Sequence, residues 1–186
     1  MPPPLCVTQL SLDDFMPDHP QPPPRTGRVI DPVSGGGVID GVIATELTAN
    51  ADPRGHLFEL LTTRDAPVED IVHVYQVVAA PGSIRAWVYH RYQHDRLVFT
   101  SGCFDVILYD IRPDSPTMNR LNVFQVGEQQ PGLFDLPPFV IHGVRNTGTE
   151  WAFFLNMPTQ VYKPDAPDKW RLPWNDPRMP YSFDAS

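Results

Sequence analysis

The chain has 186 residues, the length of a single domain that can bury a hydrophobic core without disulfides. Its 22 acidic and 14 basic residues give a net charge of -8, which does not indicate a protein that binds nucleic acid. The sequence has no window of about 18 apolar residues and no basic, apolar leader at its start, so we expect a cytoplasmic protein that does not enter a membrane.

Proline and glycine dominate the first part of the chain. The stretch "PDHPQPPPRTGRVIDPVSGGG" has no apolar period, and we interpret residues 1–37 as a proline- and glycine-rich arm. The only helical turn that we predict lies near "SLDDF", where Ser11 could act as a cap. Cys6 and Cys103 do not form a disulfide framework in such a chain. The barrel domain is predicted to begin at Val38 and to occupy residues 38–186.

Short apolar runs follow from Val38 onward, separated by turn signals. They predict strands at the spacing of an all-β sandwich or barrel, and the runs that do not alternate indicate strands covered on both faces. The last stretch, from residue 164, is predicted to be a coil that packs along the barrel through Trp170, Trp174 and Tyr181. The predicted strands are "GVIATEL", "HLFELL", "IVHVYQVV", "IRAWVYH", "RLVFTSG", "CFDVILYD", "RLNVFQV", "GLFDLPP" and "WAFFLNMP".

Two histidines and an aspartate are candidates for a shared site. The pattern around them is similar to that of metal-binding barrels of the cupin type, in which residues two apart on a strand share one ion. Val88 occupies the position of the first histidine ligand, which leaves His90, Asp95 and His142 as possible ligands of a divalent metal, with Gly102 as the motif glycine. The alternative is that these side chains are satisfied wall residues, and we favour no metal or other cofactor.

A second group of polar residues suits an anionic ligand. Arg54 in "DPRGHLFELL", Gln76 and Arg85 could surround a diphosphate or carboxylate and the edge of a base at the mouth of a barrel. The alternative is a purely structural ion pair between Arg54 and Glu59.

The stretch "YDIRPDSPT" ends a strand and enters a turn. Asp110 and Arg112 could pair there while Ser115 and Pro116 shape the bend. We expect a structural role for this motif.

Together, the segments resemble the dTDP-4-dehydrorhamnose 3,5-epimerase family of cupins. The resemblance rests on "DPRGHLFELL", "VYQVV", "PGSIRAWVYH", "LYDIRPDSPT", "LPPFVIHGV" and "YKPDAPDKWRLPWNDPRMPY", in order from about residue 38 to 181. It implies a double-stranded β-helix jelly-roll barrel, a homodimer with exchanged N-terminal strands, and a TDP-linked 4-keto-6-deoxy sugar bound without a metal.

The family's functional positions divide into two groups in this chain. The catalytic positions differ: Val88 replaces the general base, Arg96 corresponds to the lysine that stabilises the enolate, and Asn156 or Val161 replaces the general-acid tyrosine. The resemblance therefore implies altered catalytic chemistry behind a retained binding site. The substrate-binding positions are Arg54, Phe58, Glu59, Gln76, Arg85 and Asn156.

Epimerisation beside a ketone needs a base, an acid and a stabilised enolate. His90 lies two residues after Val88 and is predicted to replace the missing base, with Arg96 as the enolate partner. His142 is a polar wall residue or a second acid or base.

Three functions are compatible with these residues. The leading one is an isomerase that acts on a TDP-linked 4-keto-6-deoxy sugar by enolisation. One alternative is a barrel repurposed for a non-sugar small molecule, as a cyclase or lyase, with a metal on His90, Asp95 and His142. The other is a module that binds a sugar nucleotide without turnover.

Overall fold

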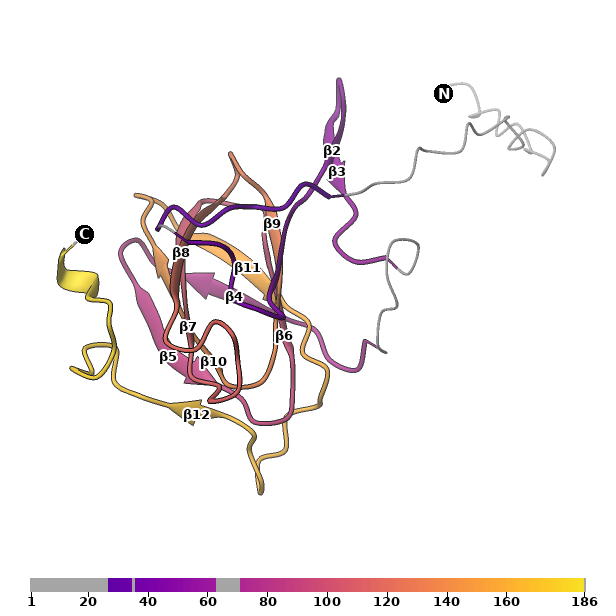
Figure 1. Cartoon of the computed structure of the whole chain (residues 1–186). Helices are drawn as coiled ribbons and strands as arrows, with labels where there is room; N and C mark the ends of the chain where they lie inside the picture. The colour runs from indigo at the N-terminus through magenta and orange to yellow at the C-terminus, as the bar shows by residue number, and fades with distance from the viewer. Residues whose placement is uncertain (1–26, 35, 63–70, 186) are drawn as a thin grey trace, which may run out of the picture.

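The computed structural model describes residues 27–34, 36–62 and 71–185, and these residues are almost entirely β-structure (Figure 1). Within them the only helix is a 3-10 turn at Phe183–Ala185, and no helix has the length and apolarity to cross a membrane. The all-β prediction is confirmed. The predicted helical turn at Ser11 and most of the predicted arm lie outside the described residues.

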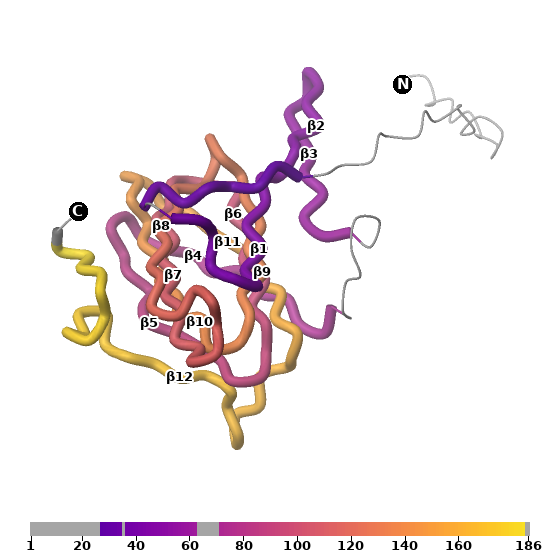
Figure 2. The backbone as a smooth tube through the Cα atoms, viewed as in Figure 1, coloured from indigo at the N-terminus to yellow at the C-terminus, as the bar shows by residue number. Residues whose placement is uncertain are grey.

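Two five-stranded antiparallel sheets face each other and form the barrel. A separate hairpin, β2–β3, stands away from it (Figures 1 and 2). The first sheet has the order β1 (Ile43–Glu46), β9 (Gly132–Leu136), β6 (Asp95–Phe99), β11 (Ala152–Asn156) and β4 (Tyr75–Ala79). The second has the order β12 (Trp170–Arg171), β5 (Ile84–Tyr89), β10 (Val140–Asn146), β7 (Cys103–Asp110) and β8 (Leu121–Gly127). The hairpin pairs β2 (Ala49–Asp52) with β3 (Gly55–Phe58).

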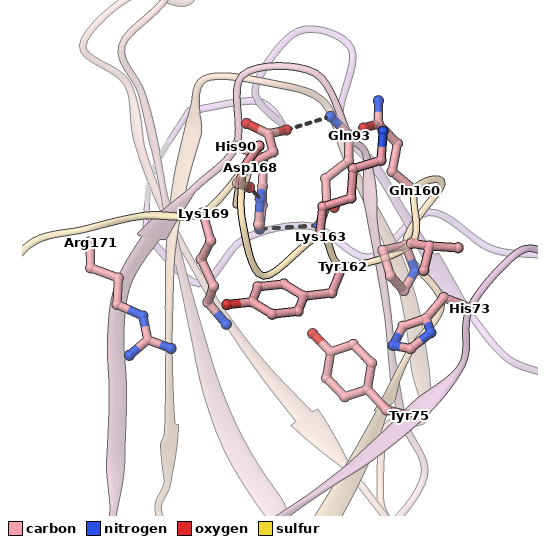
Figure 3. Close-up of a pocket in the computed structure, with 13 residues that line it drawn as sticks. His73, Tyr75, His90, Gln93, Gln160, Tyr162, Lys163, Asp168, Lys169 and Arg171 are labelled. Carbon is pink, nitrogen blue, oxygen red and sulfur yellow. Dashed lines mark hydrogen bonds between the residues drawn. The ribbon is translucent and has the colours of Figure 1, made fainter.

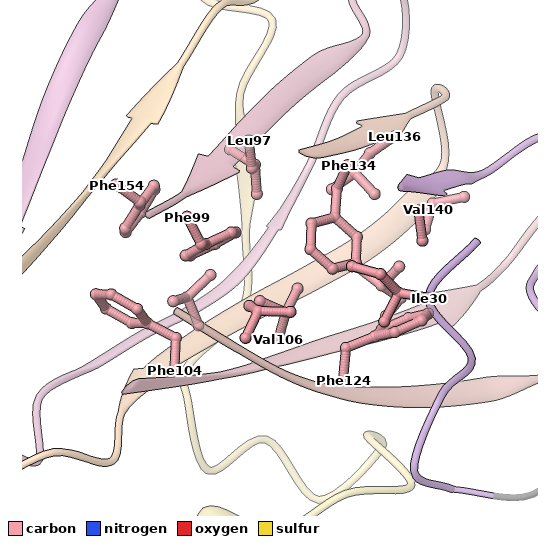
Figure 4. Packing of buried hydrophobic residues seen from close by; sticks show 14 of the residues in the cluster. Ile30, Leu97, Phe99, Phe104, Val106, Phe124, Phe134, Leu136, Val140 and Phe154 are labelled. Carbon is pink, nitrogen blue, oxygen red and sulfur yellow. The ribbon is translucent and has the colours of Figure 1, made fainter. Parts of the chain in front are cut away.

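Phenylalanine rings fill much of the space between the two sheets (Figure 4). The ring centroids of Phe99 and Phe104 are 5.2 Å apart, and those of Phe124 and Phe134 are 5.1 Å apart; each pair joins one sheet to the other. Full burial of such a side chain contributes about 1.5–3 kcal/mol. These contacts hold the sheets together on one side of the barrel and leave the opposite end open to polar residues.

The outer faces of both sheets are also covered, as the continuous apolar runs predict. On the first sheet, Val98 of β6 contacts a cluster that includes Phe58 and Leu60 from the segment after the hairpin. On the second sheet, the C-terminal segment packs over Trp87, whose Nε1 donates to the carbonyl oxygen of Trp174 at 3.1 Å. Strands buried on both faces need no alternation of apolar and polar residues.

Two boundaries differ from the predictions. Ile30 lies in the core with 2% of its surface exposed, and its backbone N–H donates to Ala44 at 2.9 Å, so the core begins before Val38. The C-terminal segment is not only coil, because Trp170 pairs with Tyr89 to form β12. The Ile30 contact and β12 each involve only one or two residues, and their partners lie outside their own stretch of sequence, so local patterns do not reveal them.

The turn between β6 and β7 requires glycine at residue 102. Gly102 has a φ of 66°, and a Cβ atom there would lie 2.2 Å from the Cβ of Ala152. The motif glycine identified from the sequence therefore has a steric reason that is independent of any ligand.

Asp110 is the centre of a buried network at the end of β7. Its carboxylate accepts hydrogen bonds from the Arg112 guanidinium at 2.8 Å and from the hydroxyls of Ser115 and Thr117 at 2.6 Å. The same arginine donates to the carbonyl oxygen of Asp40, which ties the segment before β1 to the turn. The structural role expected for this motif agrees with these contacts.

Asp110→Asn should destabilise the fold by about 2–4 kcal/mol, because it leaves Arg112 without its charge partner. The hydrogen bonds from Arg112, Ser115 and Thr117 outweigh burial and hold the pKa of Asp110 below its usual range. The difference from wild type should therefore be full at neutral pH and shrink as the pH falls below about 4. Urea denaturation at several pH values measures it, with the exposed Asp114→Asn as the control.

Candidate active site

His90, Asp95 and His142 meet at the open end of the barrel. His90 follows β5, Asp95 begins β6, and His142 lies in β10. The Nε2 atoms of His90 and His142 are 3.1 and 3.4 Å from the same Asp95 oxygen, Oδ2, and all three side chains are buried. The structure thus brings together the three residues that the sequence grouped, and we call them the His–Asp–His cluster.

Burial and charge shift the pKa values of the three side chains in this cluster in opposite directions. Burial lowers the pKa of His142 to about 4, against the attraction of Asp95, so its imidazole is neutral near pH 7. For His90, burial also favours the neutral form, but the hydrogen bond and charge of Asp95 outweigh it and raise the pKa. Burial would raise the pKa of Asp95, yet the two imidazoles hold it well below its usual range. Asp95 is therefore a carboxylate.

Asp168 fixes the orientation of His90 from the C-terminal segment. The Nδ1–H of His90 donates to the backbone carbonyl of Asp168. The Asp168 carboxylate accepts the backbone N–H groups of Arg91 and Tyr92 at 2.9 Å and of Gln93 at 3.1 Å. Because Nδ1 is committed to a carbonyl oxygen, Nε2 is directed at Asp95.

Two cavities adjoin the cluster. The inner cavity, about 370 Å³, lies between the sheets and is lined by Val88, Asp95, His142 and Asn156 among others. The outer cavity, about 510 Å³, is lined by His90 and by side chains of residues 158–171 (Figure 3). The cluster therefore borders both spaces. Three residues line both cavities: Tyr75, Lys169 and Arg171.

Those three shared residues were not predicted from the sequence. Tyr75 precedes Gln76, which was predicted to bind substrate. Adjacent residues of a strand point to opposite faces, so the alternative choice of inward face would have identified Tyr75. Lys169 and Arg171 flank Trp170 in "DKWR", so two cations on one face of a short strand were also readable. Figure 3 shows Lys169 and Tyr75 extending into the same part of the outer cavity. Burial and the nearby Arg171 lower the pKa of Lys169.

The predicted substrate-binding residues of the sheets divide between two faces. Arg85 and Asn156 line the inner cavity. Gln76 does not, because it is exposed between Tyr75 and Val77, which both face inward. Alternation along β4 places Gln76 on the outer face of the first sheet, away from the cluster.

The predicted substrate-binding residues of the hairpin also lie away from both cavities of this chain. Arg54 pairs with Asp52 at 2.5 Å rather than with Glu59. Phe58 packs beside His56, at a ring centroid distance of 4.9 Å, on the segment that leaves the hairpin. None of Arg54, Phe58 and Glu59 lines the inner or the outer cavity.

Arg96, the predicted enolate partner, points away from the cluster. Its neighbours Asp95 and Leu97 line the inner cavity, so alternation turns Arg96 to the opposite face of β6. There its Nε donates to Asp135 at 3.2 Å, and the same carboxylate contacts His94 at 2.7 Å. The assignment of Arg96 to the enolate is corrected by this geometry, because the carboxylate of Asp95 occupies the inward position.

The His–Asp–His cluster has the dimensions of a divalent metal site. The ligand atoms lie within 4.8 Å of one another. A tetrahedral ion with bonds of about 2.0–2.1 Å separates its ligand atoms by about 3.3–3.4 Å. The observed distances of 3.1 and 3.4 Å fit this geometry, and the bond from His90 to a carbonyl is the support that metal-bound imidazoles usually have. The residues therefore fit a metal as well as a proton-sharing group.

Comparison with known proteins agrees with this fold. Residues 50–170 match the family described as the polysaccharide biosynthesis C-terminal domain. The chain is 34% identical to the spore coat polysaccharide biosynthesis protein SpsL of Bacillus subtilis, over 80% of this chain and 98% of that protein. It is 36% identical to a probable low-salt glycan biosynthesis epimerase of Haloferax volcanii, over 74% of this chain and 89% of that protein.

Among solved structures, a dTDP sugar isomerase from Desulfovibrio desulfuricans is similar, with a TM-score of 0.74, 25% identity, and coverage of 80% of this chain and 94% of that one. The dTDP-4-dehydrorhamnose 3,5-epimerase from Elizabethkingia anophelis shares the fold, with a TM-score of 0.66 at 16% identity over 84% of this chain and 87% of that one. The chain belongs to the polysaccharide biosynthesis C-terminal domain family, and it shares its fold with dTDP sugar isomerases and epimerases. The resemblance and the cupin jelly-roll barrel predicted from the sequence are confirmed.

Removal of the Asp168 carboxylate should loosen the turn that carries His90. In Asp168→Ala, we expect the backbone amides of Arg91, Tyr92 and Gln93 to exchange with solvent about 10–100 times faster, since each loses its acceptor. Hydrogen exchange followed by NMR measures this effect. Asp165→Ala, an exposed neighbour in the same segment, should leave the three amides unchanged. Equal protection in both variants would contradict the assigned role of Asp168.

Proposed function

We propose that this protein is an epimerase-like isomerase that acts on a TDP-linked 4-keto-6-deoxy sugar by enolisation. The observation that carries the proposal is the buried His–Asp–His cluster beside a cavity with cationic groups at its edge. Relatives named as a glycan biosynthesis epimerase and a dTDP sugar isomerase support both the reaction class and the substrate class.

The cluster is suited to take the proton from the carbon next to the ketone. His90 is the proposed base, in place of the family histidine that Val88 replaces. One oxygen of Asp95 lies within 3.4 Å of the Nε2 atoms of both His90 and His142, so the carboxylate can balance the positive charge when an imidazole takes up a proton. A buried carboxylate between two imidazoles can hold the proton taken from the substrate until the cluster passes it on.

Cations line the inner cavity and suit the diphosphate of a nucleotide sugar. Arg85, Lys169 and Arg171 come from β5 and the C-terminal segment, and all three line this cavity. In a protein of net charge -8, such a group creates a local positive field that can attract a dianionic substrate. Guanidinium groups also bind diphosphate oxygens with a matching fork of donors.

We also propose that the protein is a homodimer in which the hairpin acts on the partner's site. Support comes from the hairpin's position away from its own barrel and from Leu57, which has 59% of its surface exposed (Figure 2). The family resemblance implies exchanged N-terminal strands. In such an arrangement Arg54, Phe58 and Glu59 would reach the nucleotide in the neighbouring barrel.

A divalent metal on His90, Asp95 and His142 is a second candidate for the chemistry of this site, favoured by the 4.8 Å spread of their ligand atoms. A bound ion would supply a Lewis acid for a substrate carbonyl. This candidate also covers a barrel repurposed as a cyclase or lyase. A module that binds a sugar nucleotide without turnover would keep the cationic residues and need neither the base nor the ion.

Proton exchange tests the proposed reaction. In D₂O, the protein should exchange the proton at C3, C5 or both of TDP-4-keto-6-deoxyglucose, as followed by NMR. His90→Ala should slow the exchange by about 100-fold or more, as expected for loss of a general base.

His94→Ala is the matched control, because His94 pairs with Asp135 on the outer face and should leave the rate unchanged. Tight TDP binding without exchange in the wild-type protein would indicate a binding module. If the wild-type protein shows neither TDP binding nor proton exchange, the sugar-nucleotide assignment is contradicted.

Metal binding separates the two candidates for the site. If the metal candidate holds, the chelated protein should take up one Zn²⁺ per chain in calorimetry, and His90→Ala should weaken this binding by about 100-fold, as loss of one ligand of three should do. His94→Ala again serves as the control. Exchange that survives chelation would support the metal-free route, while exchange lost on chelation and restored by Zn²⁺ would support the metal route.

A further inference from the structure

The inference rests on the proposed isomerisation, which needs an acid to return a proton as well as a base to remove one. Among the described residues, Arg96 does not reach the cavities, and Asn156 carries a side-chain amide, which is not an acid that can protonate an enolate. We propose that Tyr75 is the catalytic acid, delivering its hydroxyl proton to the enolate carbon.

Tyr75 is placed opposite the histidines across the substrate space. It begins β4, the edge strand of the first sheet, and it lines both the inner and the outer cavity. His142 lies on β10 in the middle of the second sheet, and His90 follows β5 of that same sheet. A sugar held between the sheets would present one face to the histidines and the other to Tyr75. Inversion of a carbon centre requires this two-sided arrangement.

The hydrogen-bond network frees the Tyr75 proton for the substrate. Asn156 Nδ2 lies 2.8 Å from the Tyr75 oxygen and 3.1 Å from Asp95 Oδ1. A carboxylate can only accept, so the atom facing Asp95 must be the amide nitrogen, and it donates to Tyr75 as well. Tyr75 therefore accepts from Asn156 and keeps its own hydrogen. Within residues 27–34, 36–62 and 71–185, no group accepts that hydrogen.

The surroundings keep the hydroxyl in its protonated form between turnovers. Burial, followed by the charge of Asp95, raises the pKa of Tyr75, while the bond from Asn156 opposes this only in part. Lys169 lines the same two cavities as Tyr75. A cation there stabilises the phenolate that forms when the proton leaves.

The step is balanced in atoms and electrons. The cluster removes the proton from the carbon beside the ketone, and the C–H electron pair becomes part of the enolate. The enolate carbon then takes the Tyr75 proton on its other face, which forms the new C–H bond and leaves a phenolate. Transfer of a proton from the protonated cluster to the phenolate through solvent restores both groups. No oxidant, reductant or co-reactant is required.

Tyr75→Phe tests the assignment, because it removes only the hydroxyl and keeps the ring. Two rates are measured in D₂O with TDP-4-keto-6-deoxyglucose: loss of the substrate proton signal and appearance of the inverted sugar. We expect inversion to fall by about 100-fold or more while the substrate proton still exchanges, since the base is intact. Tyr109→Phe is the matched control, because the Tyr109 hydroxyl donates to Asn119 at 3.0 Å and Tyr109 lines neither the inner nor the outer cavity.

The outcomes separate the two proposals. Exchange without inversion in Tyr75→Phe, with both retained in Tyr109→Phe, supports Tyr75 as the acid. Unchanged inversion in Tyr75→Phe overturns it and leaves the isomerase standing. Equal loss of both rates in Tyr75→Phe also overturns it, because the residue would then serve to shape the cavity. Absence of exchange in the wild-type protein is a failure of the proposed function itself.

Discussion

One carboxylate oxygen organises the open end of this barrel. Asp95 Oδ2 faces the Nε2 atoms of two buried imidazoles, one from the end of β5 and one from the middle of β10, and Asn156 of β11 donates to the other oxygen. A buried carboxylate is tolerated only where such partners compensate for lost water. The two sheets therefore meet at this point through charge, whereas elsewhere they meet through phenylalanine rings.

The fold was largely readable from the sequence because most of its strands are apolar and are separated by turn residues such as proline and glycine. β7 and β8 follow from "CFDVILYD" and "RLNVFQV" almost residue for residue. Three strands were not predicted. β2 was missed because "ANAD" is exposed and carries no apolar pattern, β10 because "VIHGVRN" has no apolar run longer than two residues, and β12 because it has only two residues. Such strands are defined by their partners rather than by their own composition.

The candidate site was predicted in part. His90, Asp95 and His142 were grouped by the spacing of the cupin motif, and the structure brings them together although Asp95 lies in the first sheet and the two histidines belong to the second. Arg96 was assigned to the enolate by an alignment that differs by one position from the inward register, and in a strand such a step reverses the face. Lys169 was not predicted: "DKWR" indicates two cations on one face, but only the pairing of β12 with β5 brings that face to the cavities.

The C-terminal segment has a further consequence for how the pocket can change. It supplies Asp168, Lys169 and Arg171 to the site, yet it joins the second sheet through a strand of only two residues. Its charges therefore line the cavities without belonging to the packed interior. Substitutions there can alter which anion the barrel admits while the phenylalanine core remains untouched, so ligand preference and stability can diverge independently in related proteins.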